Sequence, residues 1–264
     1  MLNKLIKYDL KWLLKVILIF HGIGLFFGII GRLTELLPDS PFFIFISKFC
    51  KGVCLSLIIT GLVNCIIRSW VRFILNMYKD ESYLTHTLPV NKNTHLLSKV
   101  LSSIIIVVIS VVILLIGLFI MYYNKETLES LKLSLNILSS NLGISVIGLL
   151  LLLGIVLLTE IIFIILIGYF GIVYGYSHNY KKPLKTFIYG GVSYLVFNVT
   201  TVIMLLIGSL FNNNLKAIVL GGSTQIEFNV LVGILWFAFI VYVVYSIIVY
   251  LLMNNKFNKG VNID

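Results

Sequence analysis

The chain is dominated by apolar runs that are long enough to cross a lipid bilayer. A bilayer core offers no water to backbone N–H and C=O groups, so such a run must fold into a helix that satisfies these groups internally. Only 11% of the residues are charged and 59% are hydrophobic, with a mean hydropathy of +1.07. Soluble domains carry about a quarter charged residues, so the sequence predicts an all-α integral membrane protein.

We expect six transmembrane helices in a single transmembrane domain that covers residues 1–264. They follow the apolar runs at 16–30, 52–67, 100–123, 142–176, 186–210 and 230–253. The fourth run would measure about 52 Å as one helix, well beyond a hydrocarbon core of about 30 Å. One helix is still predicted there, because two would move Lys181, Lys182 and Lys185 to the outer side. A short loop of balanced charge, up to about Asn141, is expected before this run.

The basic residues are unevenly shared between the two sides of the expected membrane. With six spans and both termini inside, 14 of the 20 Lys and Arg residues lie on the inner side. Positive charge is typical of cytoplasmic loops, so we expect a multi-pass protein of the cytoplasmic membrane, with both termini and residues 68–99 in the cytoplasm. The net charge of +10 favours contact with anionic membrane lipid, whereas the sequence offers no basic soluble domain for nucleic acid.

Residues 1–15 are predicted to form an amphipathic helix at the membrane surface. At 100° per residue, lysines fall on one face and apolar residues on the other. The lysines are Lys4, Lys7, Lys11 and Lys15, and the opposite face holds Leu2, Leu5, Ile6, Leu13 and Val16. Asp9 interrupts the apolar face. It marks either a helix end lifted into the lipid headgroups or a carboxylate paired with a basic residue of another element.

Small and acidic residues inside the apolar runs indicate helix contacts. Gly24 and Gly28 form a small-xxx-small pair, and Gly171 and Gly175 form another, which lets a second helix approach closely. Glu160 is the only acidic residue deep in an apolar run, where a carboxylate costs about 2.5–3.5 kcal/mol on insertion scales. It is therefore expected to face protein or a watery cavity. Its role is either in a transport path or gate, or in a structural bond or helix break.

The polar segment at residues 68–99 separates the second and third apolar runs. Asp80 and Glu81 are suited to open a short helix, because carboxylates at a helix N-terminus complement its dipole and its unpaired N–H groups. Leu88 precedes Pro89, and proline disfavours helical backbone in the residue before it. We therefore expect a short helix that ends in an extended turn.

A second helix is expected to begin just after this turn. Asn91 or Asn93 is a plausible N-cap for the helix that returns into the membrane. The segment would form a rigid projection suited to a cleft on a soluble partner, or it would be an ordinary connector. The residues alone leave both interpretations open.

A family resemblance favours the first interpretation. The loop reads Asp80-Glu81-Ser82-Tyr83-Leu84-Thr85-His86-Thr87-Leu88-Pro89-Val90, followed by Leu96-Leu97-Ser98-Lys99. This pattern resembles the first cytoplasmic loop of ABC transporter permeases of the ABC type-2 exporter family, most closely those of Gram-positive bacteria. The chain departs from the pattern at Ser82, where many of these permeases have Gly. The amphipathic N-terminal helix, the six spans and the chain length are also similar to that family.

The resemblance implies a division of labour between subunits. In such permeases this loop holds a coupling helix that sits on a separate ATP-binding subunit, and two such subunits drive two permease chains between inward-facing and outward-facing states. The implied coupling residues are Asp80, Glu81, Ser82, Tyr83, Leu84, Thr85, Leu88 and Pro89. ATP and Mg²⁺ would be bound by the partner, because the sequence lacks the G-x-x-x-x-G-K-[ST] phosphate loop. The second permease chain would be identical or related.

The function implied by the resemblance is export of a peptide, drug or other amphiphile, including self-protection against an antimicrobial peptide. The alternative is a membrane protein without ATP linkage, either channel-like or an assembly factor. Enzymatic activity is not favoured, because no H-E-x-x-H motif and no Ser, His and Asp set at a catalytic spacing occurs. Cys50, Cys54 and Cys65 lack a nearby His or Asp to complete a metal site, so no metal or cofactor is expected in this chain.

Overall fold

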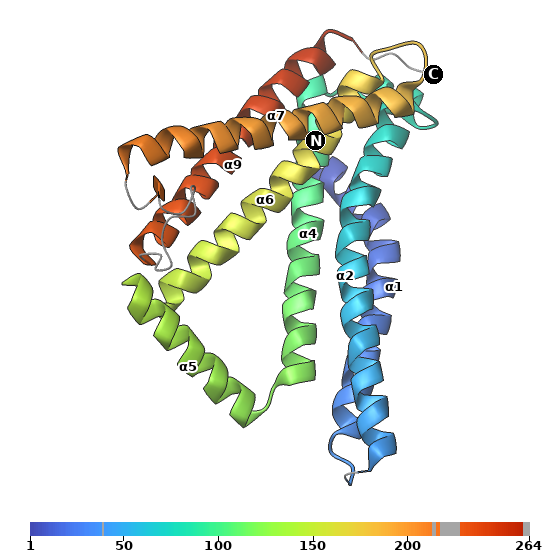
Figure 1. Ribbon diagram of the computed structural model, residues 1–264. Helices are drawn as coiled ribbons and strands as arrows, with labels where there is room; N and C mark the ends of the chain where they lie inside the picture. The colour runs from blue at the N-terminus through green and yellow to red at the C-terminus, as the bar shows by residue number, and fades with distance from the viewer. Residues whose placement is uncertain (39, 213–214, 217–227, 261–264) are drawn as a thin grey trace. The chain divides into compact units, whose positions relative to one another are not determined.

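The computed structural model describes residues 1–38, 40–212, 215–216 and 228–260, and the regular secondary structure in these ranges is helical throughout. The helices are α1 (Leu2–Thr34), α2 (Pro41–Tyr78), α3 (Ser82–Thr87), α4 (Lys92–Tyr122), α5 (Lys125–Leu142), α6 (Val146–Gly175), α7 (Lys182–Phe211) and α9 (Phe228–Asn258) (Figure 1). The chain divides into two compact units, with the boundary between Glu129 and Ser130. The single transmembrane domain expected from the sequence stays a prediction.

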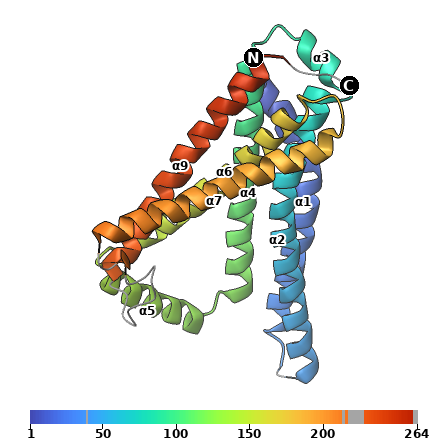
Figure 2. The same cartoon turned by 45° about the horizontal axis from the view of Figure 1, so that its top comes forward.

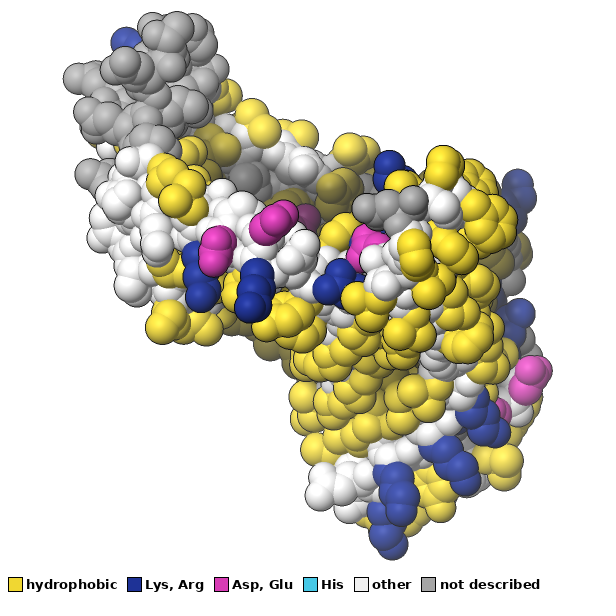
Figure 3. All heavy atoms as spheres, turned by 90° about the horizontal axis from the view of Figure 1, so that it is seen from below, with side chains coloured by type: hydrophobic (Ala, Val, Ile, Leu, Met, Phe, Trp, Pro, Cys, Tyr) yellow, Lys and Arg dark blue, Asp and Glu magenta, His cyan; other side chains and the backbone are white. Residues whose placement is uncertain are grey.

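Six of these helices are long and apolar enough to cross a membrane, namely α1, α2, α4, α6, α7 and α9. The shortest of the six apolar stretches has 29 residues and measures about 44 Å, more than a hydrocarbon core of about 30 Å. Large hydrophobic side chains cover broad areas of the face shown in Figure 3, and charged side chains stand there in a few groups. These features are consistent with the predicted multi-pass membrane protein.

The first unit is built from α1, α2 and α4, which pack against one another, with α1 and α2 side by side as a hairpin (Figure 2). Glycines set the close approach of α1 to α2. A Cβ atom on Gly24 would lie 2.9 Å from Ile58 Cγ1, and one on Gly28 would lie 2.8 Å from Cys54 Sγ. Cys54, Ile58 and Met121 form a buried core between the three helices. The structure thus places both predicted packing glycines at a helix contact.

Helix α1 is continuous over its 33 residues, which corrects the expectation of a separate interfacial helix at residues 1–15. The four lysines of its first half are exposed, as the amphipathic pattern predicts. The opposite face, however, packs on α2 and α4, with Asp9, Leu13 and Ile17 buried. The amphipathic pattern therefore marks a helix that packs on protein, because its inner face is covered by neighbouring helices.

The expected loops are also shorter than the sequence suggested. Helix α2 continues to Tyr78, well past the expected end of the second span at residue 67, whereas α4 begins at Lys92, as the predicted N-cap at Asn91 or Asn93 requires. The polar side chains at these helix ends bind one another, so a polar stretch is compatible with continued helix there. The loop expected up to Asn141 is instead the helix α5.

An ion-pair cluster closes the α1–α2 hairpin at the end opposite to α3. Arg32 Nη1 lies 2.9 Å from Glu35 Oε2, and Lys51 pairs with the other oxygen of Glu35. Burial alone would raise the pKa of Glu35, but hydrogen bonds and charges from Lys51 and Arg32 hold this pKa below its ordinary value. Arg32 Nη2 also donates to the carbonyl oxygen of Tyr123 at 2.6 Å, which ties the end of α1 to the end of α4.

The second unit contains α6, α7 and α9, and α6 packs against both of the others. The long apolar run at residues 142–176 forms the single helix α6, as predicted, and the Ser145 side chain caps its N-terminus. A Cβ atom on Gly171 would lie 2.6 Å from the carbonyl oxygen of Thr186, and one on Gly175 would lie 2.5 Å from the Thr186 nitrogen. The backbones of α6 and α7 therefore approach closely at these two glycines.

Candidate functional site

The connection between α2 and α4 contains a short helix followed by a turn. Helix α3 has six residues, with Glu81 at its N-cap position, and Thr85 Oγ1 donates to the carbonyl oxygen of Glu81 at 2.8 Å. Leu88 ends α3 in extended backbone with ψ of 136°, as expected for the residue before Pro89. Asn91 occupies the N-cap position of α4. The helix, the turn and the second helix start all lie where the sequence predicted them.

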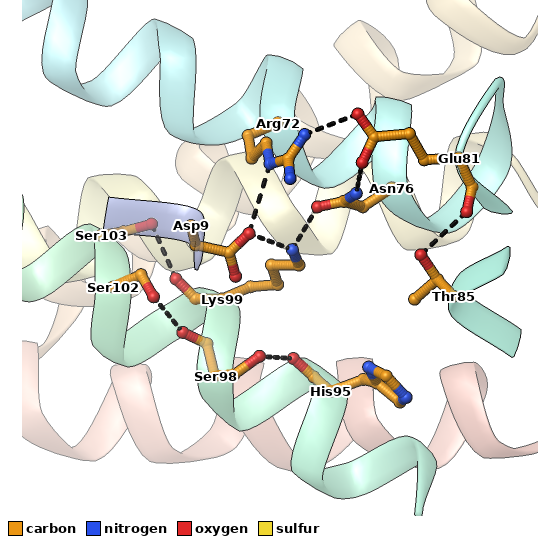
Figure 4. A network of polar contacts seen from close by, with 10 residues as sticks. All are labelled: Asp9, Arg72, Asn76, Glu81, Thr85, His95, Ser98, Lys99, Ser102 and Ser103. Carbon is orange, nitrogen blue, oxygen red and sulfur yellow. Dashed lines mark hydrogen bonds and ion pairs between the residues drawn. The ribbon is translucent and has the colours of Figure 1, made fainter. Parts of the chain in front are cut away.

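Five polar side chains from α1, α2, α4 and the start of α3 form what we call the charge network (Figure 4). Lys99 Nζ donates to Asp9 Oδ1 at 2.6 Å and also donates to Asn76 Oδ1. Arg72 Nε donates to Asp9 Oδ1 at 3.2 Å, and Arg72 Nη1 donates to Glu81 Oε1 at 2.8 Å. Asn76 Nδ2 donates to the other Glu81 oxygen. The network therefore connects α3 to three long helices.

The charge network is balanced and largely buried. It holds two carboxylates and two cations, and Asp9 and Lys99 are only 3% and 6% exposed. Desolvation offsets much of the attraction within a buried ion pair, whereas removal of one partner leaves an uncompensated charge and costs about 3–5 kcal/mol. The network therefore acts mainly to fix the relative positions of its helices, because any arrangement that separates the charges is unfavourable.

The sequence left two interpretations of Asp9 open, and the structure supports the second. The Asp9 carboxylate pairs with basic residues of other helices. Trp12, one turn further along α1, extends the same contact. The guanidinium carbon of Arg68 lies 4.5 Å from the centre of the Trp12 ring, and that of Arg72 lies 5.2 Å from it. Arginine is attracted to the electron-rich face of an aromatic ring at such distances. The start of α1 is thus held to α2 by both charge and stacking.

The eight predicted coupling residues divide into an outward-facing and an inward-facing group. The exposed residues are Asp80, Tyr83, Leu84, Leu88 and Pro89. Tyr83 is 66% exposed and Leu84 is 74% exposed, which makes α3 a short helix with an apolar outer surface. We call Tyr83, Leu84 and Leu88 the apolar tip. An apolar tip at the end of a charge network is suited to contact with another protein.

The inward-facing group holds α3 in place. Glu81 binds Arg72 and Asn76, and Thr85 binds the Glu81 carbonyl oxygen. Ser82 is fully buried, so its position accommodates only a small side chain. These three residues therefore position the apolar tip instead of forming its surface. His86 Nε2 adds a further contact, 3.2 Å from the carbonyl oxygen of Met77 on α2.

Three members of the charge network, Arg72, Asn76 and Lys99, were not identified from the sequence as site residues. The available signal was the presence of charged residues within or directly beside apolar stretches of a predicted helix. Lys99 directly precedes an apolar run, as Asp9 interrupts an apolar face. Such residues point to partners inside the protein, but only the folded helices show which partners they have.

Glu160 lies in the second unit, half-buried on α6. Its carboxylate lies near the Tyr242 side chain of α9. The ring of Tyr242 stacks on Phe197 of α7 with centroids 5.2 Å apart, and Phe163 of α6 lies 4.3 Å from Phe197. Glu160 therefore lies beside an aromatic cluster of the second unit, and a structural bond to another helix stays one of its two expected roles. A role in a transport path stays a prediction.

Comparison with known proteins gives no match to this chain among family models, curated proteins or solved structures.

Proposed function

We propose that this chain is the permease subunit of an ATP-driven ABC exporter in the cytoplasmic membrane, with both termini in the cytoplasm. The observation that carries the proposal is the apolar tip of α3, which is exposed and yet connected by buried charges to three long helices. A connector without a partner would not need an apolar outer surface, since exposed apolar area is unfavourable in water. The loop resemblance supports the same assignment.

The charge network gives α3 a mechanical path into the membrane-spanning helices. A displacement of α3 moves Glu81, whose two oxygens bind Arg72 and Asn76 on α2. Arg72 and Asn76 in turn bind Asp9 of α1 and Lys99 of α4. Because each bond in this path joins buried or half-buried groups, the helices follow α3 instead of losing contact with it. Closure of two partner subunits around ATP and Mg²⁺ would supply the displacement.

The proposed assembly contains two ATP-binding subunits and two permease chains, the second identical or related to this one. The proposed cargo is a peptide, drug or other amphiphile that moves by alternating access. This cargo class is the one implied by the loop resemblance, and antimicrobial-peptide export for self-protection belongs to it.

The proposal is tested by purification from the native cell in a mild detergent, followed by identification of co-purifying proteins and an ATPase assay. Tyr83→Asp places a charge on the apolar tip, and Tyr180→Asp is the matched control because Tyr180 is 74% exposed in the connection between α6 and α7. We expect wild type and Tyr180→Asp to retain a P-loop ATPase and Tyr83→Asp to lose it. A stable chain with no ATPase in any preparation would favour the membrane protein without ATP linkage.

A further inference from the structure

Helix α5 carries a stripe of leucines along one side. The stripe consists of Leu128, Leu131, Leu135, Leu138 and Leu142, which follow one another at alternating spacings of three and four residues. At 100° per residue these five side chains fall within an arc of about 80°. The charged residues of the helix lie outside that arc and are balanced in sign, namely Lys125, Glu126, Glu129 and Lys132. Helix α5 is thus amphipathic without a net charge.

Both ends of α5 are tied to membrane-spanning helices by very short connections. Two residues separate it from the end of α4 and three separate it from the start of α6. These connections reach at most about 7 and 10 Å, whereas α5 itself is about 27 Å long. If α5 stood upright in water, its far end could not return to the membrane where α6 begins. The short connections therefore favour an arrangement in which α5 runs along the membrane surface. The hydrogen bond from Arg32 to the Tyr123 carbonyl oxygen also holds the connection between α4 and α5 against the end of α1.

The leucine stripe is incompletely covered by the protein, since Leu131 is 55% exposed and Leu138 is 44% exposed. A helix that lies on a bilayer gains free energy when its apolar side meets the acyl chains and its polar side meets water. We propose that α5 is an interfacial helix that lies in the headgroup layer, with the leucine stripe against lipid. Its balanced charge means that zwitterionic lipid suffices. This inference does not depend on an ATP-binding partner.

Alternatively, the leucine stripe could pack against the leucine stripe of a second copy of the chain, so that the two α5 helices form a coiled coil. The alternating spacing resembles a coiled-coil seam, but a stable seam normally requires at least three to four heptads. Helix α5 has only 18 residues. An interfacial α5 would meet lipid along its entire length, whereas a seam of this length would pair only weakly. The observations therefore favour lipid over a second copy.

The test uses spin labels on the full chain in phosphatidylcholine liposomes. Leu131→Cys and Leu138→Cys place labels on the stripe. Leu133→Cys and Asn136→Cys are the matched controls, since Leu133 is 64% exposed and lies on the opposite side of the helix. Collisions of each label with oxygen, which enters lipid, and with a nickel chelate, which stays in water, are measured by electron paramagnetic resonance. Cys50, Cys54 and Cys65 are buried, and the labelled wild type measures their background.

We expect stripe labels about 5–10 Å below the headgroups, with a ratio of oxygen to nickel collisions about threefold or more above that of the controls. This difference should persist when the salt concentration is raised, because α5 has no net charge. Equal, high nickel collisions at all four positions would show that α5 lies in water and would overturn the proposal. Protection of the stripe labels from both reagents would overturn it too, because that result would show a protein contact such as a second copy.

Discussion

Lys99 Nζ on α4 lies 2.6 Å from Asp9 Oδ1 on α1, and the two residues are 90 positions apart in the chain. The pair lies at the end of the first unit from which α3 projects. Arg72 and Asn76 join it from α2 and connect it to Glu81. The position of α3 is therefore set by its bonds to α2, which the charge network joins to α1 and α4, and not only by the short loops on either side of it.

Removal of one member of the Lys99–Asp9 pair should be more harmful than removal of both. Lys99→Met leaves Asp9 partly uncompensated and should lower the free energy of unfolding by about 3–5 kcal/mol. Asp9→Leu combined with Lys99→Met leaves the balanced Arg72–Glu81 pair, so the double variant should lose less than the sum of the two single variants. Thermal unfolding in detergent measures these differences.

Lys15→Met is the control for this cycle, because Lys15 is an exposed residue on the same helix as Asp9. Its effect should stay within about 0.5 kcal/mol. Additive effects of Asp9→Leu and Lys99→Met would contradict the direct pairing.

Loss of the Glu81 side chain should loosen α3 while the long helices stay folded. Glu81→Ala removes the bonds to Arg72 and Asn76, so hydrogen exchange of the α3 amides should accelerate. Asp80→Ala is the matched control, since the neighbouring Asp80 is exposed. Mass spectrometry of peptides that cover Ser82–Thr87 measures the exchange. Equal acceleration in both variants would refute the role of Glu81 as the anchor of α3.

A single added methyl group should disturb the contact between α6 and α7. Gly175→Ala places a Cβ atom against the Thr186 backbone, and overpacking of this kind costs about 1–3 kcal/mol. On the same helix, a Cβ atom on Gly154 would meet no described atom within 4 Å, so Gly154→Ala should be neutral or stabilising. The melting temperatures of the two variants measure this difference in stability. Similar losses in both variants would argue against the close approach.

We predict that the Tyr242 hydroxyl donates a hydrogen bond to Glu160 and that this bond stabilises the second unit. Tyr242→Phe leaves the Glu160 carboxylate without this donor and should cost about 1–3 kcal/mol. Glu160→Gln keeps an acceptor for the Tyr242 hydroxyl and should cost less. Tyr180→Phe, at an exposed position, serves as the control in the same unfolding assay. A harmless Tyr242→Phe variant would show that this bond does not stabilise the second unit.

Hydropathy predicted the six long helices because the requirement to satisfy backbone groups in lipid is local to each run. Capping and proline chemistry predicted α3 and its turn for the same reason, since Glu81, Pro89 and Asn91 act within a few residues of their own positions. The glycine spacing indicated helix contacts at Gly24, Gly28, Gly171 and Gly175. It did not show which helix each glycine contacts.

The charge network could not be assembled from the sequence, because its members come from four separate elements. Asp9 alone was conspicuous, and its partner Lys99 lay at the start of a helix for which no partner could be named. The helix α5 was missed because its balanced charges suggested a loop. Its leucine spacing was visible in the sequence, but that spacing has a meaning only once the segment is known to be helical and tied at both ends.

The central claim is that α3 contacts an ATP-binding subunit, and site-specific crosslinking in the native cell tests it most directly. A photoreactive amino acid is placed at Leu84, which is 74% exposed at the apolar tip, and at Tyr180 as the control. We predict that the Leu84 position forms a light-dependent adduct that contains a P-loop ATPase, and that the Tyr180 position does not. A folded chain that gives no such adduct at Leu84, or that captures only proteins without a phosphate loop, would contradict the account.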